Sequence, residues 1–361
     1  MSTCGDGVMG SHGRLPLAPL MLGALVACGC LAQPAPSDDL TAYLDMGSAN
    51  MVRLVADPAR PYVYVADRAA NAVHFLNTAT FRIDRTLPVG SSPDAMDLKA
   101  DGSVLFVALG GGSSVVPVDL TAQTVLAAIS VPGTPTAIAS GANDRLYVSV
   151  HGNSMFGFDV SSLPAALVET TSLGGGLAIA GRAGDRSRIF THDASTGLTL
   201  TEWSVSAGAA TQLLNADIAS GPPRISSSPD GATFAFVQDT SYFVFTRWPL
   251  ENGDVPIFRT VDMLRAGTVN VEWDPVAVAL CPGGRIAVAH GDSVVNPTTS
   301  TSARHRQGTG DLHLFDATYV ESARYHLRSR VREGGIACGP DGRVYLILGG
   351  SAGNALGVIA R

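Results

Sequence analysis

The sequence predicts an all-β fold, a seven-bladed β-propeller with four antiparallel strands in each blade. Three observations support this prediction: a composition typical of β-rich proteins, about seven copies of a four-strand repeat, and incomplete copies that complement each other at the two ends of the repeat region. The chain has 361 residues, and closed β architectures of this length occur as one domain. We therefore expect residues 40–361 to form a single propeller domain.

The composition favours strands and tight turns over helices. Apolar residues make up 46% of the chain and charged residues 15%, and there are 40 glycines. The charged fraction lies well below the roughly 25% of an average globular protein. The apolar residues occur in short β-branched runs separated by Gly, Pro, Asp and Asn, and few stretches have helical spacing.

The repeat is clearest in residues 92–129. A first strand begins near Pro93, Asp101-Gly102 makes a turn, and three further apolar runs follow, at residues 104–108, 115–119 and 124–129. Related copies start near residues 49, 134, 174, 222, 274 and 334. Glycine at the Asp-Gly turn supplies the positive φ that a tight hairpin needs, and the spacing is that of propeller blades.

The two ends of the repeat region complement each other. The last copy stops after its third strand, at residues 356–361, and lacks an outer fourth strand. Residues 40–47 precede the first copy and have the pattern of that missing strand. We expect the N-terminal strand to complete the last blade, because this closes the ring and leaves no open sheet edge there.

The repeat resembles a known family. Residues 62–67 (YVYVAD), 73–77 (VHFLN) and 86–93 (TLPVGSSP) are similar to the YVTN-type repeat, as are the copies at 93–131 and 135–159. The resemblance implies a lactonase-like seven-bladed propeller. It implies no particular function, because the residues that match are structural turns and strands.

The N-terminal residues have the layout of a secretory signal. His12 and Arg14 precede an apolar run, residues 15–27, that is too short to span a bilayer permanently. Residues 25–28 (LVAC) resemble the bacterial lipobox, in which the cysteine becomes acylated. We predict a signal peptide at 1–27, lipidation of Cys28, a flexible tether at 28–39, and a membrane-tethered lipoprotein of the bacterial envelope, periplasmic or at the cell surface. The alternative is an ordinary cleaved signal that contains Cys28.

The charge pattern argues against one class of partner. The formal net charge is −7, and no basic stripe capable of neutralising phosphates is present. We expect no nucleic-acid partner, and we expect a monomer.

Histidines and acidic residues lie near the predicted ends of second strands, which meet around one mouth of a propeller channel. Asp67, His192 and His290 take these positions, and His151 lies one residue beyond its equivalent position. Neutral imidazoles at such a mouth can bind a metal ion or accept a proton. Because the three histidine-bearing blades are not all adjacent, we assign no shared metal site to them.

Further polar candidates lie at the starts of first strands and in one long loop. Asp94 and Arg224 follow the repeat proline, and the loop from Gly291 to Gly310 contains Arg304 and His305. Long loops on a rigid scaffold often carry binding residues, although a mobile loop has a similar composition. The ligand-binding candidates are therefore Asp67, Asp94, His151, His192, Arg224, His290, Arg304 and His305.

No catalytic residue and no cofactor is assigned. Residues 349–353 match G-x-S-x-G, but that motif needs a strand-to-helix elbow, so the match is interpreted as chance. Cys281 and Cys338 lie near the first strands of the last two blades. An exported protein can oxidise such a pair, and two buried free thiols are the alternative.

The first functional hypothesis is a non-enzymatic scaffold that binds an envelope protein or glycan through the face bearing these residues. The second is a lactonase-like hydrolase using Asp94, His151 and His192. The third is a metal-binding or redox protein of the periplasm. Convergence of the candidate side chains on a common point would favour the second hypothesis. Stoichiometric copper or zinc in the purified protein would favour the third.

Overall fold

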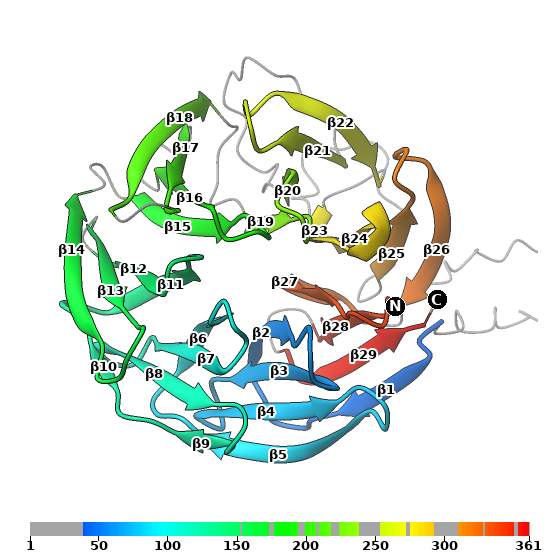
Figure 1. The fold of residues 1–361 in the computed structure, drawn as a ribbon. Helices are drawn as coiled ribbons and strands as arrows, with labels where there is room; N and C mark the ends of the chain where they lie inside the picture. Colours follow the sequence, from blue (N-terminus) through cyan, green and yellow to red (C-terminus); the bar gives the residue numbers. More distant parts are fainter. Residues whose placement is uncertain are drawn as a thin grey trace, which may run out of the picture. The chain divides into compact units, whose positions relative to one another are not determined.

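The computed structural model shows a closed ring of seven blades (Figure 1). It describes residues 39–151, 154–172, 177–193, 199–206, 209–217, 224–237, 253–271, 275–291, 310–327, 329–349 and 353–360. Each blade is an antiparallel sheet whose innermost strand faces the ring centre (Figure 1). The predicted fold class is confirmed.

The first four blades use β2 to β18. Blade 1 contains β2 (Met51–Ala56), β3 (Tyr62–Asp67), β4 (Ala72–Asn77) and β5 (Arg82–Pro88). Blade 2 contains β6 (Pro93–Leu98), β7 (Val104–Leu109), β8 (Ser114–Asp119), β9 (Thr124–Val125) and β10 (Ile129–Ser130). Blade 3 contains β11 (Pro135–Ser140), β12 (Arg145–Val150), β13 (Ser154–Asp159) and β14 (Ala166–Ser172). Blade 4 contains β15 (Leu177–Arg182), β16 (Arg188–Asp193), β17 (Thr199–Ser204) and β18 (Thr211–Asp217). In blade 2 the expected fourth strand is divided into β9 and β10, and both pieces pair with β8.

The last three blades complete the ring. Blade 5 contains β19 (Arg224–Ser227), β20 (Thr233–Val237), β21 (Asp254–Arg259) and β22 (Arg265–Asn270). Blade 6 contains β23 (Pro275–Leu280), the short 3-10 turn η1 (Pro282–Gly284), β24 (Ile286–Gly291), β25 (Gly310–Phe315) and β26 (Glu321–Leu327). Blade 7 contains β27 (Val331–Cys338), β28 (Val344–Leu348), β29 (Ala355–Ile359) and β1 (Ala42–Asp45).

The predicted ring closure is confirmed. Strand β1 pairs antiparallel with β29, with Ala42 opposite Val358 and Leu44 opposite Leu356. The backbone N–H of Met46 extends this pairing by donating to the carbonyl of Asn354 at 2.9 Å. Figure 1 shows the first and last strands side by side in one blade.

Apolar packing between blades holds the ring together. The described residues form seven buried apolar clusters, and each cluster joins two neighbouring blades. Strand alternation explains this arrangement, because successive side chains of a middle strand face the two adjacent blades in turn. In β3, for example, Tyr64 packs against blade 2 whereas Val63 and Val65 pack against blade 7.

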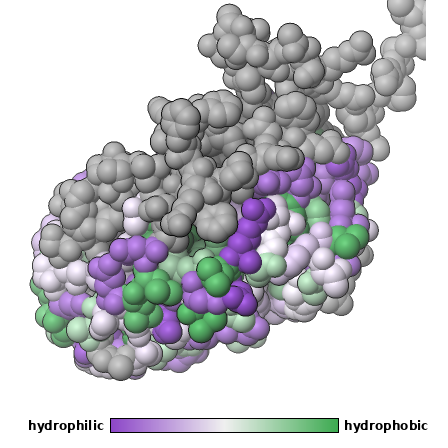
Figure 2. Space-filling model, turned by 90° about the horizontal axis from the view of Figure 1, so that it is seen from above, coloured by the Kyte–Doolittle hydropathy of each residue, from purple (hydrophilic) through white to green (hydrophobic). Residues whose placement is uncertain are grey.

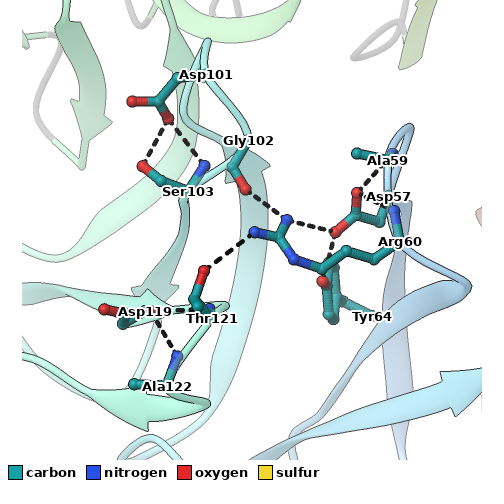
Figure 3. Close-up of polar contacts among 10 residues, drawn as sticks. All are labelled: Asp57, Ala59, Arg60, Tyr64, Asp101, Gly102, Ser103, Asp119, Thr121 and Ala122. Atoms are coloured by element: carbon teal, nitrogen blue, oxygen red, sulfur yellow. Dashed lines mark hydrogen bonds and ion pairs between the residues drawn. The ribbon is translucent and has the colours of Figure 1, made fainter.

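Short turns on one face connect strand 1 with strand 2 of each blade, and the turn in blade 1 shows how they are fixed (Figure 3). The buried Asp57 carboxylate accepts hydrogen bonds from the Ala59 N–H at 2.8 Å and from the Tyr64 hydroxyl at 2.6 Å. Arg60 binds the same carboxylate at 3.1 Å and reaches blade 2 through the Gly102 carbonyl at 2.8 Å. Gly102 has a φ of 70°, as predicted for the Asp-Gly turn.

The outer strands carry scattered exposed apolar residues. Figure 2 shows one side of the molecule, where hydrophobic residues form small groups between hydrophilic ones. Leu167 and Val168 of β14 are 49% exposed, and Leu213 and Leu214 of β18 are 42% and 38% exposed. Scattered apolar residues of this kind are normal on protein surfaces and do not by themselves indicate an interface.

A disulfide links the last two blades. Cys281 and Cys338 form a disulfide with a Cα–Cα distance of 5.3 Å, which links blade 6 to blade 7. Of the two possibilities that the sequence left open, the structure therefore has the bonded pair. Among the described residues, no helix combines the length and apolar character needed to cross a bilayer.

Candidate binding face and central channel

The antiparallel strands give the ring two unlike faces. We call the face with the connections from strand 2 to 3 and from strand 4 to the next blade the upper face. The lower face carries the connections from strand 1 to 2 and from strand 3 to 4. The connections from strand 1 to 2 are uniformly short, at residues 57–61, 99–103, 141–144, 183–187, 228–232, 281–285 and 339–343.

The upper face differs in one kind of connection. The links from strand 2 to 3 span residues 68–71, 110–113, 151–153, 194–198, 238–253, 292–309 and 349–354. They are short in blades 1 to 3 and long in blades 5 and 6. Length variation in the ring is therefore concentrated on the upper face and on two adjacent blades.

A cavity of about 440 Å³ lies along the ring axis. The innermost strands of all seven blades contribute to its wall, through residues that include Arg53, Met96, Thr136, Ile179, Ser226, Val278 and Ile336. The cavity is large enough for a small ligand or for water. Its wall mixes apolar side chains with hydroxyl and charged groups.

Two upper-face residues reach this cavity. His192 of β16 is 5% exposed and lines the cavity wall beside β15. Thr136 of β11 also lines the wall, and its hydroxyl lies 3.0 Å from that of Ser149. The structure thus places one of the predicted candidates, His192, at the channel itself.

The lower end of the cavity holds an ion pair that the repeat pattern did not indicate. Asp97 on β6 binds Arg182 on β15 through two contacts, at 2.6 Å from Nε to Oδ2 and 2.8 Å from Nη2 to Oδ1. The N–H of Ser140 on β11 donates to the same carboxylate at 2.8 Å. Blades 2, 3 and 4 are therefore joined at their innermost strands.

The electrostatics of this cluster favour the ionised carboxylate. Burial alone raises the pKa of Asp97, but the charge and hydrogen bonds of Arg182, the charge of Arg186 and the Ser140 N–H outweigh it, so the pKa is lowered. Arg186 donates to the carbonyl oxygens of Leu98 at 2.6 Å and Ser140 at 3.2 Å. Burial and the neighbouring charge of Arg182 lower the pKa of Arg186 to about 10, which leaves it charged at neutral pH.

Asp67 has a structural role at the upper face, where it binds loop backbone and a buried histidine. Its carboxylate is 2% exposed and accepts the N–H groups of Asn50 and Ala69, both at 2.9 Å. The second oxygen lies 3.2 Å from Nε2 of His74, whose other ring nitrogen lies 2.9 Å from the Thr86 hydroxyl. Asp67 thus fixes two loops and a buried histidine.

Asp94 and His151 lie apart from the channel wall. Asp94 forms an ion pair with Arg68 at 2.7 Å, across the boundary between blades 1 and 2. His151 is exposed at the end of β12, where its backbone N–H donates to the Thr134 carbonyl at 3.1 Å. Neither side chain is among the described residues that line the cavity with His192.

His290 lies on blade 6 beside Asp311, with Nε2 and Oδ2 3.6 Å apart. It is absent from the described part of the cavity wall. Of the other predicted residues, Cys28, Arg304, His305 and residues 350–352 of the G-x-S-x-G match lie outside the described residues. Arg224 begins β19 opposite Val237, and its side chain lies outside the description as well.

Comparison with known proteins supports the fold alone. No family model matches the chain, and no curated protein matches its sequence. A chain of Kuenenia stuttgartiensis hydrazine synthase has a TM-score of 0.60 and 17% identity, with 89% of this chain and 98% of that chain covered. A chain of a mitotic checkpoint complex has a TM-score of 0.66 and 14% identity, with 91% and 97% covered. The Cps50 (Swd1) β-propeller domain of Myceliophteria thermophila has a TM-score of 0.65 and 10% identity, with 89% and 99% covered.

Proposed function

We propose that this chain is an exported, lipid-anchored propeller that binds an envelope protein or glycan through its upper face and acts as a non-enzymatic scaffold. The observation that carries the proposal is the difference between the two faces. The links from strand 1 to 2 on the lower face are short in every blade, whereas the links from strand 2 to 3 lengthen in blades 5 and 6.

This difference matters because a closed ring of blades is a rigid support. Residues inserted into a connection between strands cost the scaffold little, and recognition residues concentrate in such connections. Insertions spread over both faces would indicate tolerance without selection for position. Their concentration on two adjacent blades of one face fits a single contiguous contact region.

The proposed localisation is supported by the N-terminal pattern and by the disulfide. Residues 9–30 have the order of a signal peptide, with Cys28 at the lipobox position. The Cys281–Cys338 disulfide fits a protein that matures in an oxidising compartment, since such bonds are rare in the cytosol. The resemblance to the YVTN-type repeat of surface proteins agrees with this localisation.

The binding proposal can be tested by crosslinking in intact cells, followed by pull-down of the tagged chain and mass spectrometry. In the test variant, residues 292–309 are replaced by the sequence of residues 68–71, which joins the equivalent strands 2 and 3 of blade 1. Val320→Asp is the matched control, because Val320 is 60% exposed on the lower-face turn of the same blade. We expect a stoichiometric partner with the wild type and the control, and its loss from the loop variant.

A partner retained by the loop variant, or none above background with the wild type, would contradict the proposal. A Cys28→Ala variant tests the anchor in the same experiment. We expect this variant to leave the membrane fraction while remaining exported. A wild-type chain that fractionates as a soluble protein would refute lipidation.

A further inference from the structure

Blade 6 carries a cluster of metal-binding residue types away from the central cavity. His290 on β24 lies directly opposite Asp311 on β25, and His313 follows two residues later on the same face of β25. Residues farther along this face, Val288 and Phe315, pack against blade 5. The cluster therefore lies on the side of blade 6 that faces blade 5, near the upper ends of both strands.

The three side chains converge. One potential ligand atom of each lies within 4.8 Å of those of the other two. His290 Nε2 and Asp311 Oδ2 are 3.6 Å apart, and the two imidazole rings have centroids 5.1 Å apart. Ligands bound to one tetrahedral ion at about 2.0–2.2 Å are separated by roughly 3.3–3.6 Å, so small side-chain movements would complete the site.

His313 is the residue that points to a ligand. Its side chain is fully buried, and its Nδ1 lies 2.9 Å from a Glu321 carboxylate oxygen. Its other nitrogen, Nε2, is shielded from solvent and has no hydrogen-bond partner among the described residues. Glu321 favours a proton on Nδ1, and this leaves the Nε2 lone pair available. Histidines that bind metal ions usually donate their other ring N–H to a carboxylate in this way, which fixes the orientation of the ring.

Further polar and charged side chains surround the cluster. His326 Nδ1 lies 2.9 Å from Asp311 Oδ1, and Arg324 contacts Glu321 at 3.3 Å.

We propose that His290, Asp311 and His313 form a binding site for one divalent transition-metal ion of the zinc class. Two imidazole nitrogens and one carboxylate oxygen suit such an ion and leave a fourth position for water or an external group. His290 and Asp311 lie on β24 and β25, next to the strand ends that the connection at 292–309 joins. The proposal stands independently of the proposed function.

The test uses the full-length chain, purified without a polyhistidine tag, stripped with chelator and titrated with Zn²⁺ against a chromophoric chelator. Equilibrium dialysis followed by elemental mass spectrometry gives the stoichiometry. We expect one tightly bound equivalent in the wild type. We expect His290→Ala and Asp311→Asn each to weaken binding at least 100-fold, and Glu321→Gln to weaken it about 10–100-fold, as loss of an orienting carboxylate does.

The matched control is His151→Ala, which removes an exposed histidine from another blade of the same upper face and should bind Zn²⁺ like the wild type. His290 is partly exposed, so its removal tests the site without the packing defect that a change at the buried His313 introduces. Absorption of the Co²⁺-loaded chain adds a direct reading of the ligand set. No bound equivalent in the wild type, or equal affinity in His290→Ala, Asp311→Asn and the control, would overturn the proposal.

Discussion

At the scale of the residue, the contact between Asp97 and Arg182 joins chain segments that are far apart in sequence. The two residues lie on the innermost strands of blades 2 and 4, with the Ser140 N–H of blade 3 completing the cluster. A buried charge is tolerated only when it is paired and hydrogen-bonded. Asp97 is the anionic partner of both Arg182 and Arg186. Loss of its carboxylate therefore leaves two neighbouring cations without their shared counter-charge.

We expect Asp97→Asn to reduce the free energy of unfolding at pH 7 by about 2–3 kcal/mol, less than for a fully buried pair because Arg182 is partly exposed. The pKa of Asp97 is lowered in the folded state, so its contribution is present at neutral pH. That contribution declines as the pH falls below about 4, where the unfolded carboxyl binds a proton. Urea unfolding between pH 7 and pH 3 should show the two proteins converging in acid.

Asp84→Asn is the control for this measurement, because Asp84 lies exposed on β5 and should change stability by no more than about 0.5 kcal/mol. A gap between wild type and Asp97→Asn that stays constant from pH 7 to pH 3 would show that the ion pair does not stabilise the fold.

Single side chains were the hardest feature to predict from the sequence. The repeat indicated that His192 lies near the channel mouth, and it does line the cavity. The repeat did not predict the ion pair between Asp97 and Arg182. A repeat shows which positions are equivalent in successive blades, and it gives no information on contacts between blades that are not neighbours. His313 was missed for another reason: an isolated histidine in a strand gives no sign of the neighbours that pairing with β24 and β26 provides.

At the scale of the element, β1 is a short edge strand whose pairing a single substitution can weaken. It is short, it forms the outer edge of blade 7, and only alternate residues are partly buried. The N–H of Met46 points to β29, and residues two apart in a strand share this direction. The N–H of Leu44 therefore faces β29 as well.

We expect Leu44→Pro to weaken the pairing of β1 with β29, because proline cannot donate to the ladder. The loss should be about 1–3 kcal/mol, the cost of leaving one backbone group unsatisfied together with the lost packing. Hydrogen exchange should rise at residues 355–359, the partner strand. Tyr43→Ala, at a side chain 48% exposed on the same strand, should leave exchange there unchanged. Equal protection in the two variants would contradict the predicted role of β1.

Strands were predicted more accurately than single contacts. The predicted end of the second strand agrees with the structure at Asp67 in blade 1, whereas His192 and His290 each lie one residue before the ends of β16 and β24. The apolar alternation and the Asp-Gly turns fix these boundaries locally. The division of the outer strand of blade 2 was not predicted, because its exposed residues have little patterning.

At the scale of the whole molecule, the disulfide joins blade 6 to blade 7. Blade 7 is the blade that β1 completes to close the ring. The two cysteines are 57 residues apart in sequence. A crosslink of this span stabilises mainly by restricting the unfolded chain. Their pairing was left open by the sequence, since distance in space depends on how neighbouring blades align.

We expect the double variant Cys281→Ser, Cys338→Ser to lose about 2–4 kcal/mol of unfolding free energy relative to the oxidised wild type. Chemical denaturation with and without reductant measures this difference, and reductant should have no effect on the variant. Removal of residues 1–27 should keep the chain in the cytosol, where disulfides rarely form. Its unfolding free energy should therefore equal that of the double variant. Two alkylatable thiols at these positions in the exported wild type would disprove the bond.

The pairing of β1 with β29 also sets an order in time. Each other pairing joins strands that are close along the chain, so six blades can assemble without β1. Strand β1 is made first and finds its partner last, after residue 359 has been synthesised. Such a long-range contact forms slowly, and until it forms β29 keeps an open edge that another chain can join. We therefore expect association with another copy of the chain to be most favoured before β1 has paired with β29.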